Sequence, residues 1–272
     1  MTIFSDKSFS QKLERAEAVT NADFVEARAR LFPASGAEWI DVGGVYAMFD
    51  GIASPLTQTY GLGIFDEITN VELDEIEEFF KRHAAPVFHE VSPLADASLI
   101  GLLNERCYQP IELTSVMYRM LGAEDALDSQ ANPRISTRIV SGDEIDIFAE
   151  TSVAGWSAEM PEFADFGIEL CKIGAVTKGA SPFIAEFDGK PIATGMLFVY
   201  EDVALFGGAS TIFEGRRKGA QNALLEARLR FAAERGCAIP TMGASPGSQS
   251  QRNAEKNGFR VAYTRTKWQL KQ

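Results

Sequence analysis

The chain has 272 residues, of which 46% are hydrophobic and 24% are charged, and this composition is that of a globular protein rather than of a disordered or fibrous one. Its 38 acidic and 26 basic residues give a net charge of −12, which argues against a whole surface built to bind nucleic acid or an anionic membrane. The length allows one or two domains, each able to bury its own core.

The charge is distributed unevenly along the chain. Residues 1–132 contain 22 acidic and 9 basic residues, whereas residues 216–272 contain 3 acidic and 12 basic residues. This asymmetry suggests two units, of which the C-terminal one could bind an anion. Taken alone, the asymmetry is explained better by a solvated basic surface than by an anion site.

The three cysteines, Cys107, Cys171 and Cys237, are odd in number and widely spaced. No CxxC pair occurs, so the sequence predicts neither a disulfide framework nor a zinc site, and we expect no metal. The first residues lack the basic start and apolar core of a signal peptide, and acidic residues interrupt the most apolar region, 191–209. We therefore expect a cytoplasmic protein without a membrane-spanning segment.

The first half of the chain is predicted to alternate strands with helices. A polar stretch without periodicity, residues 122–134, follows it and is predicted to be a linker. The turn over residues 65–70 is acidic, which would repel an anion. Helices are predicted at 22–31, 70–82 and 96–106, and strands at 45–50, 57–65, 88–91 and 111–120.

The second half is predicted to have a similar order of elements. Ser141 and Glu144 have the spacing of a capping box, and Asp188-Gly189 that of a hairpin turn. Gly236 is placed to cap the end of the clearest helix. Strands are predicted at 136–140, 183–187, 191–200, 203–211, 237–242 and 259–270, and helices at 141–155, 162–173, 219–235 and 248–257. The buried face of the clearest helix is predicted to consist of Ala220, Ala223, Leu224, Ala227 and Phe231.

The candidate chemistry lies in residues 203–235, where a strand leads through a basic loop into a helix. Arg216, Arg217 and Lys218 form the loop, and Gly219 opens the helix. A helix start exposes unpaired N–H groups and a partial positive charge, and basic side chains add attraction for phosphate. The spacing matches neither a Walker loop nor the dinucleotide-binding glycine pattern. The segment therefore predicts a pyrophosphate site of another type.

Two motifs in the second half define that type more closely. Arg216-Arg217-Lys218-Gly219-Ala220-Gln221 matches [R/Q]-x-x-G-x-[G/A] except at Gln221, and Glu255-Lys256-Asn257-Gly258-Phe259 matches E-K-x-G-F. Over roughly residues 134–272, these motifs and the order of elements resemble the GNAT superfamily of acyl-CoA-dependent N-acetyltransferases. The resemblance implies an α/β (α+β) fold of two GNAT-like domains, residues 1–121 and 135–272, each with a mixed, mostly antiparallel sheet flanked by helices. The first lacks the phosphate loop and is expected to be degenerate.

The resemblance also implies a reaction: acetyl transfer from acetyl-CoA to a primary amine of a small molecule or peptide, by direct attack in a ternary complex. The pantetheine would lie along the strand that ends at Thr211, where the backbone N–H of Ala209 would polarise the thioester carbonyl and stabilise the oxyanion. The residues expected to contact acetyl-CoA, the co-substrate, are Ala209, Ser210, Thr211, Arg216, Arg217, Lys218, Gly219, Ala220, Gln221, Ser250 and Asn253.

The sequence departs from the family at the acid. The tyrosine that protonates the leaving thiolate in many members is replaced by Ala254, and Tyr263 on the last strand is a weak substitute. Trp156 and Phe166, together with Met160, are expected either to contact the acceptor amine or to form core. Candidates for the general base are the acidic residues at strand ends, Glu186, Asp188, Glu201 and Asp202.

Alternative interpretations stay open at this point. His83 and His89 are expected at a helix end or on the surface, and Cys237 as a small apolar residue. A non-catalytic acyl-CoA-binding or regulatory module is the alternative function. Nucleic-acid binding through the basic stretch is opposed by the acidic first half, so we expect no nucleic acid and no membrane as partners. A homodimer is possible, and the acceptor amine and the acyl preference are not indicated.

Overall fold

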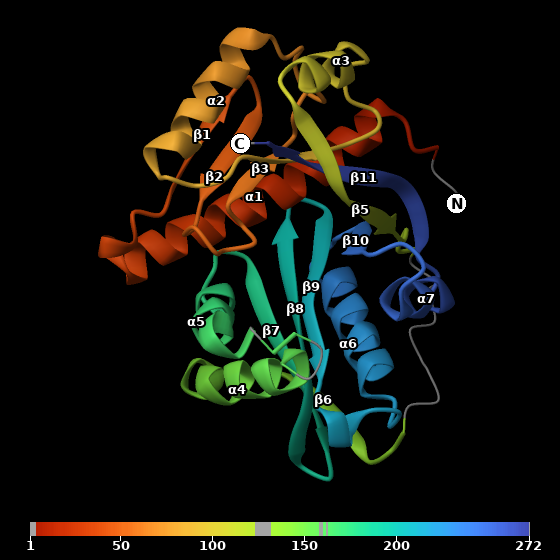
Figure 1. The fold of residues 1–272 in the computed structure, drawn as a ribbon. Coiled ribbons are helices and arrows are strands. Elements are labelled where there is room, and N and C mark those ends of the chain that lie inside the picture. Colours follow the sequence, from red (N-terminus) through yellow and green to blue (C-terminus); the bar gives the residue numbers. More distant parts are fainter. Residues whose placement is uncertain (1–3, 123–131, 158–159, 162, 272) are drawn as a thin grey trace. The chain divides into compact units, whose positions relative to one another are not determined.

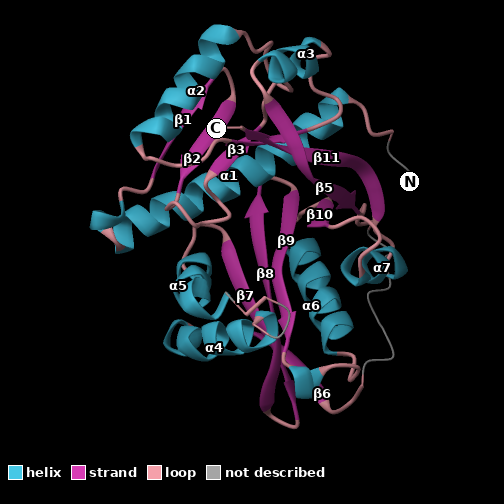
Figure 2. Cartoon of the chain, viewed as in Figure 1, coloured by secondary structure: helices cyan, strands magenta, loops and turns pink. Residues whose placement is uncertain are grey.

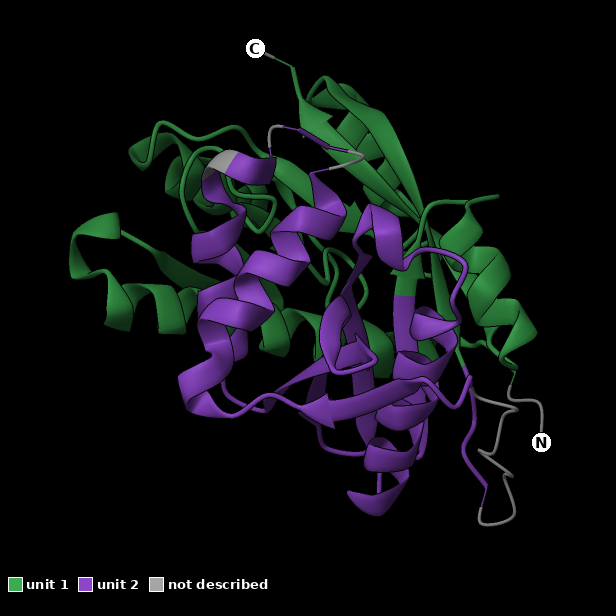
Figure 3. Cartoon of the chain, turned by 90° about the horizontal axis from the view of Figure 1, so that it is seen from below, with its two compact units in different colours: residues 1–118, 243–272 green, residues 119–242 purple. Residues whose placement is uncertain are grey.

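The computed structural model describes residues 4–122, 132–157, 160–161 and 163–271, and the chain forms two compact units (Figures 1 and 3). Unit 1 contains Met1–Tyr118 and Gly243–Gln272, and unit 2 contains Arg119–Met242. Most of the predicted linker, residues 123–131, lies outside the described residues. The chain thus leaves unit 1 after Tyr118 and returns to it at Gly243.

The compact units differ from the predicted division at both boundaries: unit 2 begins at Arg119, and residues 243–272 lie in unit 1. The last strand, β11 (Arg260–Leu270), pairs antiparallel with β4 (Phe88–Val91) on one side and with β5 (Tyr108–Tyr118) on the other. The partners of a strand are the strands that tertiary structure places beside it. The order of elements along the chain does not show which strands those are. The sequence pattern therefore could not predict that the last 30 residues pack in unit 1.

Unit 1 is built on a mixed sheet in the order β1-β2-β3-β4-β11-β5. All its neighbours are antiparallel except β3 and β4, which pair in parallel at Thr59 and His89. The first three strands are β1 (Glu38–Val42), β2 (Val45–Phe49) and β3 (Gln58–Tyr60). Its helices are α1 (Lys7–Leu31), α2 (Asn70–Arg82), α3 (Ser98–Glu105) and α7 (Gln249–Lys256), with a 3-10 turn, η1, at Pro33–Ser35.

Both faces of the unit 1 sheet are covered. Successive side chains of β2 alternate: Ala47 and Phe49 pack in a core with α2 and α3, whereas Met48 packs in a second core with α1. Helix α2 begins with a capping box at Thr69, which holds its first turn in place.

The strands of unit 2 have the order β10-β9-β8-β7-β6, and neighbouring strands are antiparallel except for β9 and β10 (Figure 2). Asp188 and Gly189 both have left-handed backbone, as the predicted hairpin turn between β7 and β8 requires. The strands are β6 (Ile135–Ile139), β7 (Ala180–Phe187), β8 (Lys190–Tyr200), β9 (Val203–Thr211) and β10 (Ile239–Ala244), the last of which belongs to unit 2 up to Met242.

The helices of unit 2 cover the two faces of its sheet. On one face, α4 (Ile145–Trp156) and α5 (Phe163–Ala175) form a core in which Phe148 packs with Ile184 and Met196. Helix α6 (Ala220–Glu234) packs against β6, β7, β8 and β9. Two 3-10 turns, η2 (Gly142–Glu144) and η3 (Phe213–Gly215), precede α4 and α6.

The predicted fold class, a mixed α/β fold with mostly antiparallel strands flanked by helices, is confirmed, and some elements differ in extent. Helix α1 begins at Lys7 instead of residue 22, because Asp6 caps it by accepting a hydrogen bond from the Phe9 N–H. Strand β3 ends at Tyr60, since Gly61 and Gly63 have left-handed backbone. Strand β1 was not predicted. Across the described ranges, none of the helices combines the length and apolar character that crossing a bilayer requires.

Candidate functional site

In unit 2, β9 separates from β10 part of the way along its length. The two strands pair in parallel only from Val203 to Leu205, opposite Ile239 to Thr241. Beyond Leu205, β9 continues to Thr211 with β8 as its registered partner. The other edge of this segment is free of β10, and such an edge can accept an extended ligand that carries amide groups.

The same segment of β9 contains a bulge. Thr194 of β8 pairs with Ser210, and Met196 pairs with Gly207, so that Gly208 and Ala209 together face the single residue Gly195. Gly208 has a φ of +57°, a left-handed conformation that favours glycine at such a bulge. Ala209 has no registered partner on β8, so its peptide group is displaced from the regular ladder.

The loop after β9 delivers the chain to an open helix start. Gly219 precedes α6 with a φ of +95°, and in the described part of the chain no side chain caps the helix. A Cβ atom built on Gly219 would come no closer than 4.0 Å to its nearest neighbour, a carbon of Ile135, so the space in front of the helix is open. The first N–H groups of α6 can therefore serve an anion.

Basic side chains surround this helix start. Arg217 is exposed and has left-handed backbone. The Arg216 guanidinium lies 5.8 Å from the centre of the Phe213 ring, and the Lys218 ammonium lies 4.3 Å from that of Phe187. These charges add to the partial positive charge of the helix end.

Gln221, the departure from the family pattern, connects the two parts of the site. Its Nε2 atom donates hydrogen bonds to the Ser210 carbonyl oxygen at 2.7 Å and to the Thr211 Oγ1 atom at 2.8 Å. The side chain thus joins the first turn of α6 to the end of β9. No sequence signal indicated this contact, because it depends on where β9 ends in space.

The side chain of Ser210 has a structural role. Its Oγ atom lies 3.1 Å from Thr194 Oγ1 and donates to the Ser152 carbonyl oxygen at 3.0 Å. A Cβ atom on Gly155 would lie 2.5 Å from Ser210 Oγ, so α4 packs directly onto the end of β9. Any contact of Ser210 with a ligand would therefore be made by its backbone.

Three of the predicted site residues, Ser250, Asn253 and Tyr263, belong to unit 1, whereas the basic loop belongs to unit 2. Tyr263 is 7% exposed, and its hydroxyl donates to Glu14 Oε1 at 2.8 Å. Burial raises the pKa of Tyr263 well above its usual value. Ser250 and Asn253 lie on α7, where Asn253 Oδ1 accepts from Gln249 Nε2 at 2.7 Å. These surroundings do not support Tyr263 as a proton donor to a leaving group.

The predicted acceptor residues belong to an aromatic cluster of α4 and α5. The Phe163 ring is buried and lies 6.2 Å from the Trp156 ring and 5.3 Å from the Phe166 ring. Trp156 is half-buried, whereas Phe166 and Met160 are 37% and 40% exposed. Phe163 is therefore core, and the other three retain surface that an acceptor can reach.

Two of the candidate bases form ion pairs. Arg138 Nη2 lies 2.9 Å from Glu186 Oε1, and Arg134 pairs with Asp188. Hydrogen bonding to Arg134 lowers the pKa of Asp188. Both carboxylates therefore already have a cationic partner.

The two histidines and Cys237 have different environments: His83 lies at a helix end, whereas His89 and Cys237 are buried. His83 ends α2, as predicted, with Nε2 2.9 Å from Glu38 Oε1. The expectation for His89 is wrong: it is completely buried on β4, and burial lowers its pKa to about 3. Cys237 is 3% exposed, which confirms that it packs as a small apolar residue.

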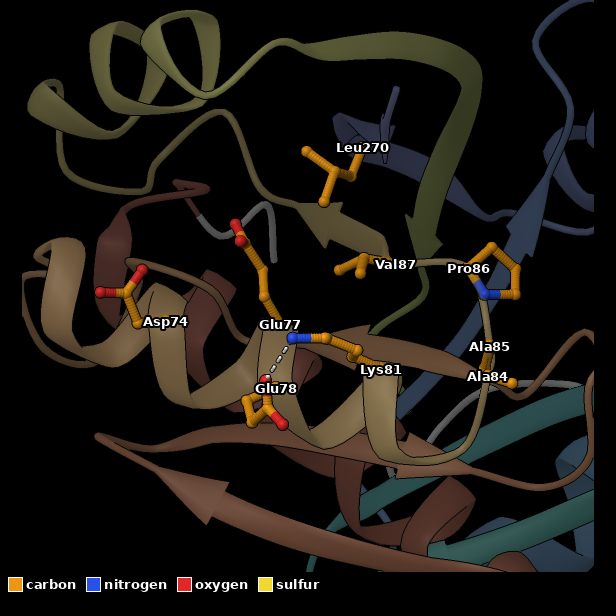
Figure 4. Close-up of a pocket in the computed structure, with 9 residues that line it drawn as sticks. All are labelled: Asp74, Glu77, Glu78, Lys81, Ala84, Ala85, Pro86, Val87 and Leu270. Carbon is orange, nitrogen blue, oxygen red and sulfur yellow. Dashed lines mark hydrogen bonds and ion pairs between the residues drawn. The ribbon is translucent and has the colours of Figure 1, made fainter. Parts of the chain in front are cut away.

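A pocket of about 610 Å³ lies in unit 1, between α2 and the end of β11 (Figure 4). Its charged groups are paired: Lys81 Nζ lies 3.2 Å from Glu78 Oε2, and Arg106 contacts Asp74 and Glu77. The pocket has no open helix start and none of the predicted site residues, so it does not compete with the site in unit 2. It is lined by Asp74, Glu77, Glu78, Lys81, Ala84, Ala85, Pro86, Val87 and Leu270.

Comparison with known proteins gives a match in structure. Neither a protein-family model nor a curated protein matches the sequence. A GCN5-related N-acetyltransferase from Kribbella flavida aligns with a TM-score of 0.64 and 16% identity over 92% of this chain and 95% of that chain. A tandem GNAT protein from the clavulanic acid biosynthesis pathway aligns with a TM-score of 0.60 and 12% identity over 84% and 79%. A GCN5-related N-acetyltransferase from Sphaerobacter thermophilus aligns with a TM-score of 0.55 and 15% identity over 79% and 72%. These similarities confirm the fold that the two motifs predicted: the chain has the fold of the GNAT N-acetyltransferases.

Proposed function

We propose that this protein is an acyl-CoA-dependent N-acetyltransferase that binds acetyl-CoA along β9 and at the start of α6 in unit 2. One observation carries the proposal: β9 pairs with β10 only from Val203 to Leu205 and continues to Thr211, and the loop that follows delivers the chain to an uncapped, basic helix start at Gly219. Acetyl-CoA has amide groups that suit a strand edge and a pyrophosphate that suits a helix start.

The pyrophosphate would be held mainly by backbone donors. The N–H groups of Gly219, Ala220 and Gln221 belong to the first turn of α6, where no intrahelical acceptor is available to them. Arg216, Arg217 and Lys218 would add charge-assisted contacts. The Gln221 side chain would leave this space free, because it is bonded to the end of β9.

The thioester would lie at the bulge of β9. The N–H of Ala209 would donate to the carbonyl oxygen, on which negative charge develops as the amine attacks. Gln221 and the contact of Gly155 with Ser210 hold this segment from two sides, so the donor is fixed before the reaction begins.

The acyl transfer would proceed by direct attack in a ternary complex. The amine nitrogen forms a bond to the carbonyl carbon, the carbon–sulfur bond breaks, and its electron pair leaves on the thiolate. The proton lost by the amine passes to water or to a base, and acceptor contacts are proposed for Trp156 and Phe166.

Calorimetric titration with acetyl-CoA tests the proposal. In Arg216→Glu plus Gly219→Asp, two carboxylates would face the pyrophosphate at the helix start, and binding should weaken by at least about 100-fold. The matched control is Arg230→Glu plus Gly142→Asp, which introduces the same charges at an exposed position on α6 and at a glycine whose Cβ position is open. Equal affinity in the two double variants would exclude the assigned site.

A second function, a non-catalytic acyl-CoA-binding module, is favoured by one observation. Ala254 occupies the position of the usual acid, and Tyr263, the substitute, is buried against Glu14. A screen of primary amines that monitors release of free CoA separates the two functions. Release with any amine supports the enzyme, whereas tight binding without release across the screen supports the module.

A further inference from the structure

Arg228 is a buried cation on α6. Arg228 is 3% exposed, and this burial lowers the pKa of its guanidinium to about 10. The group therefore keeps its charge at neutral pH. Its Nη1 atom donates to the Met196 carbonyl oxygen and its Nε atom to the Leu224 carbonyl oxygen, each at 3.1 Å. Within the described part of the chain, no carboxylate forms an ion pair with it.

The guanidinium lies against the backbone opposite the bulge. A Cβ atom on Gly195 would come within 2.8 Å of Arg228 Cζ, so the group covers Gly195 directly. Gly195 is the residue of β8 that faces Gly208 and Ala209. Neighbouring strands of a sheet lie ~5 Å apart, so the positive charge rests on the strand that is the immediate neighbour of the bulge. The Phe206 ring, 5.1 Å away, lies on another side of it.

A charge in such a place is costly to the folded protein. Taking an ion out of water is unfavourable unless an opposite charge compensates it, and two carbonyl dipoles compensate a full charge only in part. An anion that forms at the bulge would supply the missing compensation. Low local polarity would strengthen the attraction, because little water lies between the charges.

We propose that Arg228 is a positioning residue that stabilises the thiolate leaving from coenzyme A at the β9 bulge, acting through the backbone of β8 and β9. The proposal rests on the proposed acetyltransferase function and adds a residue that the GNAT motifs do not contain. When the carbon–sulfur bond breaks, its electron pair remains on sulfur, and the fixed cation stabilises that charge. No proton donor is needed at that moment, and the thiolate takes its proton from water after release.

The test is a titration of coenzyme A bound to the protein, followed by the far-ultraviolet absorbance of its thiolate, with bound desulfo-coenzyme A as the reference. In the parent protein the pKa of the bound thiol should lie below that of free coenzyme A titrated under the same conditions. Arg228→Met should raise it by about one unit, a tenfold change, whereas Arg228→Lys should preserve most of the effect. The control Arg230→Met removes an exposed cation from the same helix and should leave the pKa unchanged.

Desulfo-coenzyme A separates this proposal from the proposed function. Because it has no thiol, its affinity should be the same in the parent and in Arg228→Met. If neither ligand binds the parent, the acetyl-CoA site itself fails. If both bind and the thiol titrates identically in Arg228→Met, the role of Arg228 is overturned. Should Arg228→Met not fold, Arg228→Gln, which keeps N–H donors without the charge, gives the same two outcomes.

Discussion

Both units contain a strand that is followed by a loop and a helix. The two helices differ in whether side chains cap their first N–H groups. In unit 1, α2 follows β3, and Thr69 and Glu72 close its first turn with reciprocal hydrogen bonds that lower the pKa of Glu72. In unit 2, α6 follows β9 and begins at Gly219 without a side-chain cap. The comparison shows that a few residues at the start of a helix decide whether side chains satisfy its first N–H groups, as in α2, or leave them open, as in α6.

The buried arginines of the two units also differ in whether neighbouring side chains compensate their charge. Arg265 of unit 1 lies among three carboxylates, with Glu17 Oε2 at 2.8 Å, Glu90 Oε2 at 2.9 Å and Glu14 Oε2 at 3.4 Å. Arg228 of unit 2 has carbonyl oxygens as its hydrogen-bond partners. Unit 1 compensates its buried charge internally, whereas unit 2 keeps positive charge in two places where the proposed co-substrate is anionic.

The largest expected effect compares the two arginines directly. Arg265→Met would leave Glu14, Glu17 and Glu90 without their shared cation, and the free energy of unfolding should fall by about 3–5 kcal/mol. Arg228→Met removes an uncompensated charge at the expense of two hydrogen bonds, so its cost should stay below about 2 kcal/mol. Urea denaturation measures both. Equal losses would mean that the two charges are compensated alike.

A smaller effect concerns pH and Glu14. Burial, only partly offset by Arg265, raises the pKa of Glu14 from 4.5 to about 7. The folded protein therefore holds a proton on Glu14 that the unfolded chain releases near pH 4.5, and this contribution to stability is lost as the pH rises towards 7.

Glu14→Gln removes that titration. Relative to the parent, the variant should therefore be more stable at pH 8 than at pH 5, by a difference on the order of 2–3 kcal/mol in the free energy of unfolding. Denaturation at the two pH values measures it. The surface variant Glu75→Gln serves as the control, and a difference that does not change with pH would contradict the interpretation of Glu14.

The sequence predicted those parts of the fold whose cause is local. Helix α2 and strand β4 were predicted to the residue, because an apolar face, a capping residue and a bounded β-rich run lie within each segment. The pairing of β11 with β4 and β5 was not predicted, since the partners of a strand are set by tertiary structure.

The same distinction applies to the candidate site. The basic loop and its glycine are contiguous, and so they could be predicted. Arg228 could not, because an arginine on a helix is ordinarily exposed. Its spacing from Leu224, Leu225 and Ala232 nevertheless places it on the buried face. Of the predicted buried face of α6, Ala223, Ala227 and Phe231 are only half-buried, so the face is rotated towards Arg228.

A further prediction sharpens the role of Gln221 in unit 2. Gln221→Glu is nearly isosteric, but an ionised carboxylate cannot donate to the Ser210 carbonyl oxygen. The free energy of unfolding should fall by about 1–2 kcal/mol, and acetyl-CoA should bind more weakly. Gln249→Glu, an exposed residue on α7, is the matched control for the change of charge. Unchanged affinity in Gln221→Glu would exclude a role for this contact in binding.

The smallest effect tests whether the capping box on α2 is all that prevents unit 1 from binding acetyl-CoA. Thr69→Gly with Glu72→Ala removes both hydrogen bonds of the capping box on α2 and should cost about 1 kcal/mol of stability. It should not create acetyl-CoA binding, because Asp66 and Glu67 stand before this helix where Arg216–Lys218 stand before α6. The measurement is made in the Arg216→Glu plus Gly219→Asp background, so that unit 2 contributes no signal. Binding in that background would show that the open helix start alone decides, and that the basic residues of unit 2 are dispensable.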